Sequence, residues 1–590
     1  MGFRDPHSYS DLAQGTVERI RFSIRADFSE SMLHVKAHYA LQKPASGSLF
    51  LDTRGLHVER VTADGLNLPW EIDRRDAILG ERLHLKNLRQ VTQFAIEVTT
   101  SSDAMALQWM KPSQTLGGKL PFLYSQCQSI QARSIFPCQD TPSVRLTYEA
   151  ELEVPHALTA VMAAEPVGTE RMGKSTLYKF SMRQPIPSYL FALAVGDIQF
   201  REIGSRTGIY AEPEMVGPSA WEFAENEAKI AAAEQLLGPY LWDRYDILVL
   251  PPSFPFGGME NPRLTFLSPL VVLGDRSRTD VVSHELAHAW TGNLVTNATW
   301  EDFWLNEGWT TYAEGRITEL LRGHDFNNLV SVVGLNHLFE DMHRFGENAK
   351  ETCLKFSQEG LDPEEVYSQV SYVKGSMFLL ALEEAVGRKA FDAFIQKYIS
   401  TYRFQSLSTE EFVRFLTGEL PEAVRRVDVD QWIYKPGYPA DGPQQSSVLY
   451  DDVRAKLAGY QQGIFPDPEA VSSWVPQQVL LFLQLLPRRI PVEDCRRLEQ
   501  LFDLPKVRYT AILVDFFQVA IASGYREVMS NVERFAQTVG NRSALGQLFQ
   551  ALTEEEWSRG LARPLFERYR DRNHPLTVAH VEQILKKAGL

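Results

Sequence analysis

Residues 281–290 read VVSHELAHAW, with His284 and His288 four positions apart and Glu285 directly after the first. Side chains four positions apart on a helix lie on one face about one turn apart, so both imidazoles can reach one metal ion. The same residues would also suit the polar face of an ordinary helix. The stretch alone therefore leaves a metal site and a structural helix both open.

A third metal ligand is available further along the chain. A catalytic zinc ion takes three protein ligands and keeps one position for water. The stretch WEDFWLNEG (300–308) supplies Glu307, with eighteen residues between it and His288, at the expected start of a second helix that can pack on the first. Glu285, about 100° round the helix from His284, can face a metal-bound water from the side. We therefore predict a zinc site made by His284, His288 and Glu307.

A glycine-rich stretch, PSFPFGGMENPRLTF (252–266), follows an expected buried strand. Gly257 and Gly258 let the backbone approach a ligand closely, and Met259 and Glu260 come next, the latter with a carboxylate for a cation. Taken alone, the stretch also fits a turn that carries a solvated glutamate. Both interpretations stay open at this point.

Together these stretches resemble the M1 zinc aminopeptidases, which have a thermolysin-like catalytic domain, and in particular their leukotriene A4 hydrolase branch. Four stretches carry the resemblance: LYSQCQSIQARSIFPCQDTPSVRLTY (123–148), VLPPSFPFGGMENPRLTF (249–266), HAWTGNLVTNATWEDFWLNEG (288–308) and DPEEVYSQVSYVKG (362–375). It extends over essentially the whole chain and thins near the C-terminus. It implies one zinc ion per chain and hydrolysis of the N-terminal peptide bond of short peptides, by glutamate-assisted attack of a zinc-bound water.

The resemblance also implies roles for single residues. His284, His288 and Glu307 match the zinc ligands, Glu285 matches the general base, and Glu260 matches the residue that binds the substrate's free α-amino group. Tyr372 of VSYVKG matches a tyrosine whose hydroxyl donates to the developing oxyanion, although a tyrosine there is otherwise often a packed aromatic.

Gln128 matches a glutamine that contacts substrate in this family. The stretch SQCQS (125–129) predicts a strand in which Gln126 and Gln128 share a face, so that both amides line a cleft. Without the resemblance, an amide that satisfies a sheet edge would be the preferred interpretation.

The resemblance weakens at two places. Glu364 and Tyr367 match residues associated with epoxide opening in leukotriene A4 hydrolase, but the first is an aspartate in the vertebrate enzyme, one methylene shorter. Ser558, Arg559 and Gly560 stand where that enzyme has an Arg-Met-Lys carboxylate-binding segment. Arg559 is therefore a candidate for binding a carboxylate, and a solvated surface arginine is an equally good interpretation. Added epoxide hydrolase activity is therefore kept as an alternative function. A third possibility, an inactive peptide-binding scaffold, is disfavoured by the complete set of metal ligands and base.

The periodicity of the chain and the resemblance together predict a multidomain α+β protein. We expect an N-terminal antiparallel β saddle domain (1–200), a thermolysin-like α/β zinc catalytic domain (201–436), a linker rich in proline and glycine (437–447) and an all-α C-terminal domain (448–590). A chain of 590 residues is too long for one hydrophobic core, which agrees with several domains.

Composition limits the classes of binding partner and the cellular location that we expect for the protein. The net charge of −15 disfavours nucleic-acid binding, which needs a basic face. The longest apolar stretches, such as ILVDFFQVAIA (512–522), are too short to span a bilayer, and the first residues lack the pattern of a secretory signal. The four cysteines are scattered, as is typical of reduced thiols. We therefore expect a cytoplasmic monomer that acts on short peptides, without membrane or nucleic-acid partners.

Overall fold

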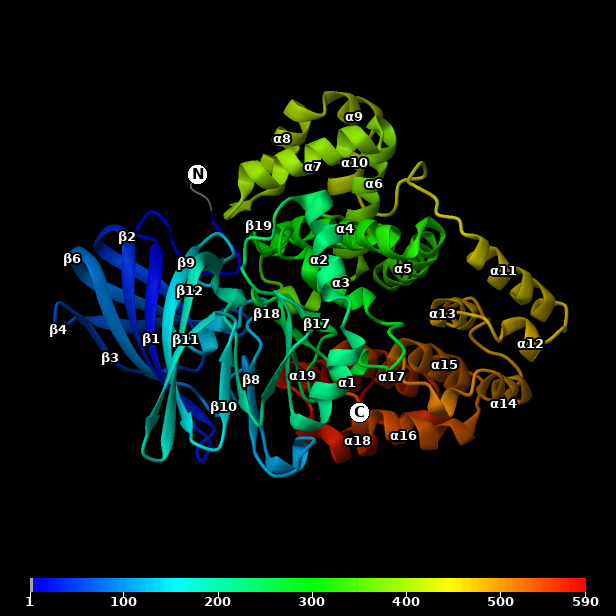
Figure 1. Ribbon diagram of the computed structural model, residues 1–590, viewed down its shortest axis with the longest axis horizontal. Helices are drawn as coiled ribbons and strands as arrows, with labels where there is room; N and C mark the ends of the chain where they lie inside the picture. Colours follow the sequence, from blue (N-terminus) through cyan, green and yellow to red (C-terminus); the bar gives the residue numbers. More distant parts are fainter. Residues whose placement is uncertain (1–3, 347) are drawn as a thin grey trace.

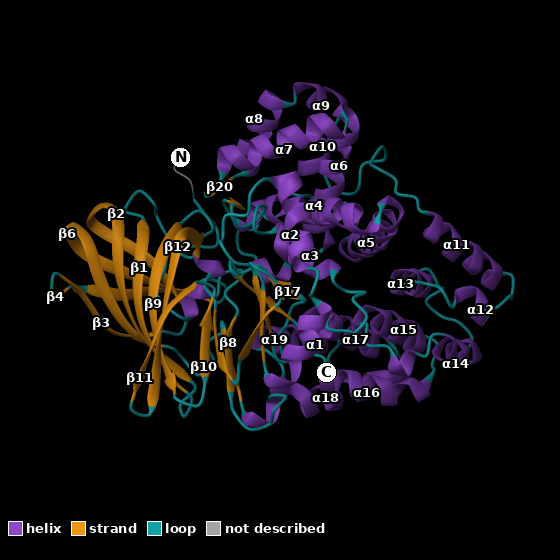
Figure 2. Ribbon diagram, viewed as in Figure 1, coloured by secondary structure: helices purple, strands orange, loops and turns teal. Residues whose placement is uncertain are grey.

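The computed structural model describes residues 4–346 and 348–590, so residues 1–3 of the expected first domain lie outside it. Figure 1 shows a β-rich part at one end, a central mixed part and a helical part that curves beneath the central one. The strands gather at the N-terminal end of the molecule, and helices make up most of the remainder (Figure 2). This is the predicted three-part order of β, mixed and helical structure.

A nine-stranded sheet forms most of the N-terminal part, in the order β11-β12-β9-β1-β2-β6-β3-β4, with β5 paired to β6. Its strands are β1 (Val17–Asp27), β2 (Met32–Thr53), β3 (His57–Ala63), β4 (Leu66–Asn67), β5 (Trp70–Asp76), β6 (Gly80–Thr99), β9 (Arg145–Pro155), β11 (Glu165–Met172) and β12 (Ser175–Pro187). Buried and exposed residues alternate along β1 and β9, as expected when one face of a sheet covers a core. One pairing differs from the expected antiparallel domain, because β1 runs parallel to β9.

A smaller sheet has the order β10-β13-β8-β7. It contains β7 (Leu107–Met110), β8 (Phe122–Ser125), β10 (Thr159–Met162) and β13 (Leu193–Gly196). The prediction that SQCQS is one strand is wrong, because β8 ends at Ser125 and the amide of Gln131 then closes a turn on the carbonyl of Cys127 at 2.9 Å. Ser129 in this turn donates its backbone and side-chain groups to Glu364 rather than to a neighbouring strand.

The central part begins with a five-stranded sheet in the order β14-β15-β16-β18-β17. Its strands are β14 (Gln199–Glu202), β15 (Gly208–Ala211), β16 (Asp246–Val249), β17 (Gly258–Met259) and β18 (Leu264–Leu267); a separate pair joins β19 (Val295–Asn297) to β20 (Gln405–Leu407). Gly258 pairs with Leu267 and Met259 with Phe266, which fixes the glycine-rich stretch at the edge of the sheet.

Ten helices accompany this sheet among the described residues. They are α1 (Pro213–Glu222), α2 (Asn226–Leu237), α3 (Asp280–Ala287), α4 (Trp304–Arg322), α5 (His324–Phe345), α6 (Gly375–Val386), α7 (Arg388–Tyr402), α8 (Thr409–Glu419), α9 (Pro421–Arg426) and α10 (Val429–Tyr434). The fully buried Trp304 and Trp309 anchor α4, and the ring of Trp309 stacks on Tyr398 of α7 at 5.0 Å between centroids. Burial of such large aromatic surface holds the first turn of α4 in place.

After an irregular segment, every regular element described from Val448 onward is helical. These elements are α11 (Val448–Gln461), α12 (Pro468–Val471), α13 (Pro476–Gln484), α14 (Val492–Leu501), α15 (Thr510–Ala522), α16 (Met529–Thr538), α17 (Arg542–Glu554), α18 (Glu556–Tyr569) and α19 (Pro575–Lys587), with short 3₁₀ turns between some of them. They enclose a hydrophobic core of their own, to which α5 contributes Leu329, Val332 and Val333. The helical part is thus a separate domain that packs on the central one.

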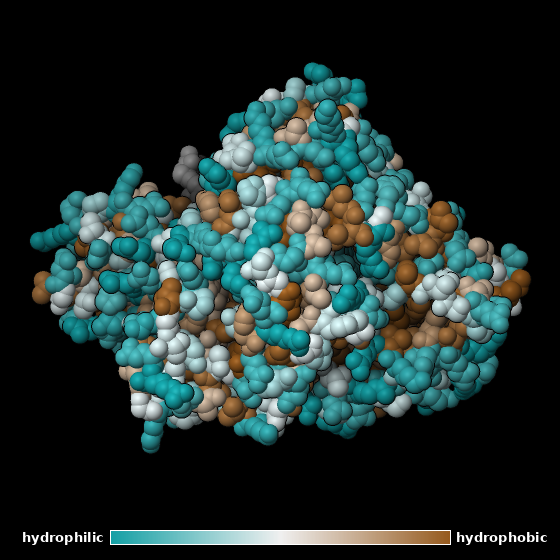
Figure 3. Space-filling view, viewed as in Figure 1, coloured by the Kyte–Doolittle hydropathy of each residue, from teal (hydrophilic) through white to brown (hydrophobic). Residues whose placement is uncertain are grey.

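The surface seen in Figure 3 is mainly hydrophilic, with scattered hydrophobic patches. All four cysteines are free and buried. Within the described ranges, no helix combines the length and the apolar character needed to cross a membrane.

Candidate active site

The three predicted metal ligands meet where α3 packs on α4. The Nε2 atoms of His284 and His288 are 3.2 Å apart, and Glu307 Oε2 lies 3.2 Å from the first and 3.5 Å from the second. Ligand atoms bound at 2.0–2.1 Å in a tetrahedral zinc site are separated by about 3.3 Å. The three side chains therefore form a triangle of the size that a zinc ion requires.

Hydrogen bonds at the far side of each imidazole decide which nitrogen faces this triangle. His284 Nδ1 lies 2.9 Å from Glu314 Oε2, and His288 Nδ1 lies 3.1 Å from the carbonyl oxygen of Thr291. Both partners accept hydrogen bonds, so each neutral ring carries its proton on Nδ1 and a lone pair on Nε2. Two lone pairs and a carboxylate oxygen then face one another, and a cation between them would remove their mutual repulsion. The residues thus fit a zinc ion.

Two glycines set the distance between α4 and the segment that carries Tyr372. A Cβ atom built on Gly308 would come within 2.9 Å of the α-carbon of Gly375, so the two backbones are in direct contact. Tyr372 lies in the π-helical turn Val370–Lys374 that leads into α6, and its ring faces His284 with 6.1 Å between centroids. Burial raises the pKa of Tyr372 and the charge of Glu307 raises it further, so the phenol stays protonated as a hydrogen-bond donor.

Glu285 is buried on α3 and faces the edge strand β17. A Cβ atom at Gly258 would come within 2.5 Å of the Glu285 carboxyl carbon, so only glycine leaves room for this carboxylate. Burial raises the pKa of Glu285 to about 8. A cation on the three ligands lowers this pKa again, towards the charged form that a base needs.

Glu260 lies close to both Glu285 and His288. Carboxylate oxygens of Glu260 and Glu285 and a ring nitrogen of His288 lie within 4.8 Å of one another. The Nε2 atom of Gln128 lies 3.4 Å from Glu260 Oε1, and Asn293 donates to the Glu260 carbonyl at 2.6 Å. The glutamate side chain is therefore held at the end of β17, beside the metal ligands.

Comparison with known proteins shows which family the chain belongs to. The chain matches the models of the peptidase M1 N-terminal domain over residues 6–190, the peptidase family M1 domain over 221–432 and the leukotriene A4 hydrolase C-terminal domain over 474–585. It is 35% identical to "Leucine aminopeptidase 2" of Neosartorya fischeri, over 99% of this chain and 98% of that protein. The chain belongs to peptidase family M1.

Further relatives of this M1 peptidase agree with that assignment. "Leukotriene A-4 hydrolase" of Xenopus laevis is 34% identical over 97% of this chain and 98% of that protein. The structure of yeast LTA4 hydrolase in complex with Bestatin superimposes with a TM-score of 0.90 at 30% identity, over 99% of this chain and 97% of that one. The predictions of the family, of the three-domain fold class and of a zinc-dependent aminopeptidase are confirmed.

Glu364 and Tyr367, the two residues predicted to match those of epoxide opening, both contact Ser129 of the N-terminal domain. Glu364 Oε1 accepts two hydrogen bonds from Ser129, and Glu364 Oε2 pairs with Arg542 of α17 at 2.6 Å. The Tyr367 hydroxyl lies 3.2 Å from Ser129 Oγ. Arg542 was not found by sequence reasoning; the signal for it was Glu364 itself, since a buried carboxylate needs a cationic partner.

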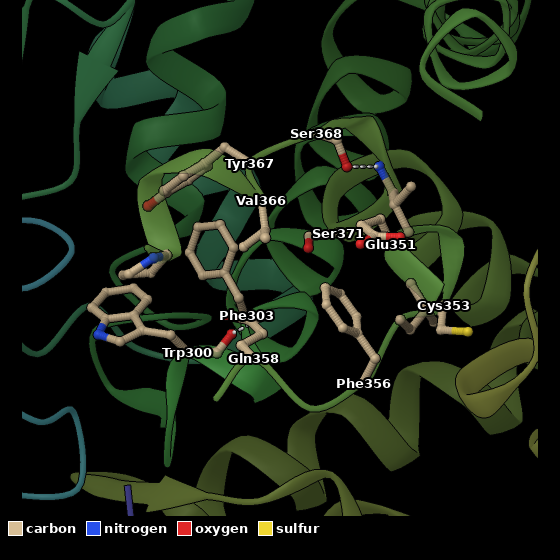
Figure 4. A pocket seen from close by; sticks show the side chains of 13 residues that line it. Trp300, Phe303, Glu351, Cys353, Phe356, Gln358, Val366, Tyr367, Ser368 and Ser371 are labelled. Atoms are coloured by element: carbon tan, nitrogen blue, oxygen red, sulfur yellow. Dashed lines mark hydrogen bonds between the residues drawn. The ribbon is translucent and has the colours of Figure 1, made fainter. Parts of the chain in front are cut away.

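Tyr367 lines one side of a small cavity (Figure 4). Aromatic side chains line it, together with Glu351, Cys353 and Gln358; the aromatic residues are Trp300, Phe303, Phe356 and Tyr367. Its volume of about 20 Å³ is enough for a water molecule but too small for a long lipid chain.

Two predicted residues differ from the crowded Gly258. Gly257, directly before it, has no atom within 4 Å of a built Cβ, so open space adjoins its backbone. Arg559 is exposed on α18 and donates to the carbonyl of Ala588 at the end of α19. The structure therefore does not bring Arg559 to the other candidate residues.

Proposed function

We propose that this M1 peptidase removes the N-terminal residue of short peptides, with one zinc ion per chain held by His284, His288 and Glu307. The observation that carries the proposal is the second carboxylate, Glu260, which lies beside Glu285 and the metal ligands and is only 3% exposed. A buried carboxylate whose side-chain contact is an amide favours a cation from the substrate. The terminal ammonium of a peptide is such a cation.

The spacing of the two carboxylates supports exopeptidase specificity. With the ammonium at Glu260, the first peptide bond lies near Glu285 and the metal ligands. An internal peptide bond brings no positive charge and would leave Glu260 unpaired, so its binding is penalised. Gln128 helps to orient the Glu260 carboxylate.

The protein groups around the scissile bond have distinct tasks. A zinc ion on the three ligands supplies Lewis acidity, which lowers the pKa of water and polarises a carbonyl. Glu285 takes the proton of the attacking water and passes it to the leaving amine. The protonated hydroxyl of Tyr372 donates to the oxygen on which negative charge develops.

A matched pair of substrates tests this function. Leucine p-nitroanilide and its N-acetyl derivative differ in the amino-terminal charge and can be compared for the zinc-loaded wild type, Glu285→Gln and Glu260→Gln. We expect cleavage of the free-amine substrate alone, a loss of kcat in Glu285→Gln and a raised KM in Glu260→Gln. Equal cleavage of the acetylated substrate would contradict the proposal, as would wild-type activity in Glu285→Gln.

The alternative of added epoxide hydrolysis has less support. The relative from Xenopus laevis carries the name leukotriene A-4 hydrolase, and Tyr367 is present. However, Glu364 Oε1 already accepts two hydrogen bonds from Ser129 and Oε2 pairs with Arg542, so most of the acceptor capacity that could position a water is taken. We therefore propose peptide hydrolysis alone. A cytoplasmic location and a monomeric state stay predictions.

A further inference from the structure

The turn before α17 brings the helical domain into contact with the central domain. Arg542, the first residue of α17, donates from Nη1 to Glu364 Oε2 at 2.6 Å and from Nη2 to the Glu364 carbonyl at 2.7 Å. The side chain of Arg542 is 14% exposed and that of Glu364 is 5% exposed. A two-point contact between such buried groups fixes the guanidinium in one orientation.

The same Glu364 carboxylate also contacts Ser129 of the N-terminal domain. Its Oε1 atom accepts hydrogen bonds from the amide and the hydroxyl of Ser129, both at 2.8 Å. The residue before Ser129 is Gln128, whose side chain contacts Glu260. The position of Gln128 thus depends on Glu364, and the orientation of the Glu364 carboxylate depends on Arg542.

A second route runs through the backbone. The amide of Arg542 donates to the carbonyl of Pro255 at 2.7 Å, three residues before Gly258. A Cβ atom on Gly540 would come within 2.6 Å of the α-carbon of Ser253, so this turn lies directly against the loop that leads to Gly258 and Glu260. The hydroxyl of Thr577 on α19 holds the turn by donating to the Gly540 carbonyl at 3.1 Å.

The turn is also capped from within its own domain. Asn541 is the N-cap of α17 and accepts a hydrogen bond from the amide of Ala544 at 2.9 Å. Capping of this kind fixes the first turn of a helix. Arg542 is therefore presented to Glu364 and Pro255 by a rigid element.

We propose that Arg542 is a positioning residue for recognition of the peptide N-terminus. Without touching substrate, it holds Gln128 through Glu364 and Ser129, and through Pro255 it holds the loop that leads into β17 and Glu260. The inference rests on the proposed function, in which Glu260 binds the α-amino group. The helical domain thereby contributes to binding of an amine that it does not contact.

The competing role for a cleft arginine is direct binding of the peptide's C-terminal carboxylate. The two roles separate on substrates that lack this group. Arg542→Met is compared with wild type on leucine p-nitroanilide, on a leucine-initiated tripeptide and on the same tripeptide with an amidated C-terminus. Positioning raises KM about tenfold for all three and changes kcat little, because binding is weakened without loss of a group that reacts. An increase in KM confined to the free-acid tripeptide would overturn the inference, as would an unchanged KM.

A double variant ties the effect to Glu260. If Arg542 acts through the Gln128 and Glu260 contact, Arg542→Met raises KM much less in a Glu260→Gln background than in wild type. Full additivity would refute the inference. The proposed function fails in a different way, since Glu260→Gln alone would then leave KM unchanged.

Two further variants guard against a structural artefact. Arg542→Lys keeps the charge with fewer contacts, so its KM lies between those of wild type and Arg542→Met; a KM equal to that of wild type contradicts the proposal even if Arg542→Met does not fold. Arg496→Met removes an exposed arginine of the same domain, one that pairs with Glu493 and Glu527, and leaves KM unchanged. A raised KM in Arg496→Met would show that the effect is a general loss of the domain's structure.

Discussion

The carboxylate of Glu285 packs against the α-carbon of Gly258, at a distance that leaves no room for a methyl group. The base that we propose for the reaction is thus positioned by the absence of a side chain on a neighbouring strand. The adjacent Gly257 has open space at the same position, so the two glycines serve different purposes.

This contact predicts opposite outcomes for two neighbouring alanine substitutions. Gly258→Ala displaces Glu285 from its position, and misplacement of a catalytic group by about 1 Å costs on the order of 100-fold in rate. Gly257→Ala leaves Glu285 in place because no protein atom obstructs the methyl group, so kcat stays within about twofold and any loss of close ligand approach appears in KM. Steady-state kinetics on leucine p-nitroanilide measures both. A Gly258→Ala enzyme with normal kcat would contradict the claim that Gly258 sets the position of Glu285.

Glu314 predicts a change in metal affinity. Its carboxylate holds His284 Nδ1 at 2.9 Å, so it fixes the tautomer that points the Nε2 lone pair at the metal. We expect Glu314→Gln to weaken zinc binding by about 10-fold or more. Competition with a chelator of known affinity measures this directly.

The control for that experiment lies on the same helix. Glu319 pairs with Arg388 at 2.8 Å, away from the ligands, and Glu319→Gln should leave zinc affinity unchanged. Equal zinc affinity in wild type and Glu314→Gln would rule out this supporting role.

The contact of Gly308 with Gly375 predicts a loss of stability. A methyl group at either position forces α4 and α6 apart, and overpacking of this kind costs about 1–3 kcal/mol. Gly418→Ala on α8 meets open space and is instead expected to stabilise by up to about 1 kcal/mol, from helix propensity. Thermal unfolding of wild type, Gly308→Ala and Gly418→Ala tests whether the first substitution lowers the stability and the second raises it. A Gly308→Ala variant as stable as wild type would mean that the helices can shift without cost.

His574 predicts sensitivity to acid. It caps α19 by accepting from the amide of Leu576 at 3.1 Å, and its buried ring stacks on Tyr124 of β8. Burial lowers its pKa from 6.5 to about 3, with Arg542 adding to the effect. Between these values the unfolded chain binds a proton that the folded one does not. This contribution to stability is therefore complete above pH 6.5 and is lost as the pH falls towards 3.

A variant that keeps the cap but cannot titrate tests this linkage. Asn is a good N-cap residue, so His574→Asn should lose less stability than wild type between pH 7 and pH 5. Urea unfolding at the two pH values gives the comparison, and the difference approaches about 1.4 kcal/mol per pH unit at most. His57→Asn, at an exposed strand position, is the control. An unchanged pH dependence in His574→Asn would remove His574 from the explanation.

The clustering of His284, His288 and Glu307 was predictable because its determinants are local. The spacing of His284 and His288 fixes their common face on one helix, and Glu307 begins the next helix. The prediction of a strand through Gln128 was wrong because the chain turns after Ser125. In this turn Ser129 donates a hydrogen bond to Glu364, which lies far away in the sequence. Alternation of residue types contains no information about such a partner.

The arginine of the helical domain that contacts the site, Arg542, was harder to predict from the sequence. The sequence holds 60 lysines and arginines, and a local likeness drew attention to Arg559, which lies exposed on α18. Arg542 is at the start of a different helix and meets Glu364 only through the packing of separate domains. A buried glutamate requires a cationic partner, but the identity of that partner depends on how the domains pack and is not contained in the local sequence.

The close approach of α4 and α6 also bears on how such an enzyme can diverge. Gly308 and Gly375 join the first turn of α4 and the segment that carries Tyr372 into one rigid body, next to the ligand Glu307. Gln128, in contrast, lies in a turn of another domain. Mutations that reshape the substrate side of the cleft can therefore accumulate while the geometry around the metal ligands is inherited unchanged, and new peptide preferences can evolve without rebuilding the chemistry.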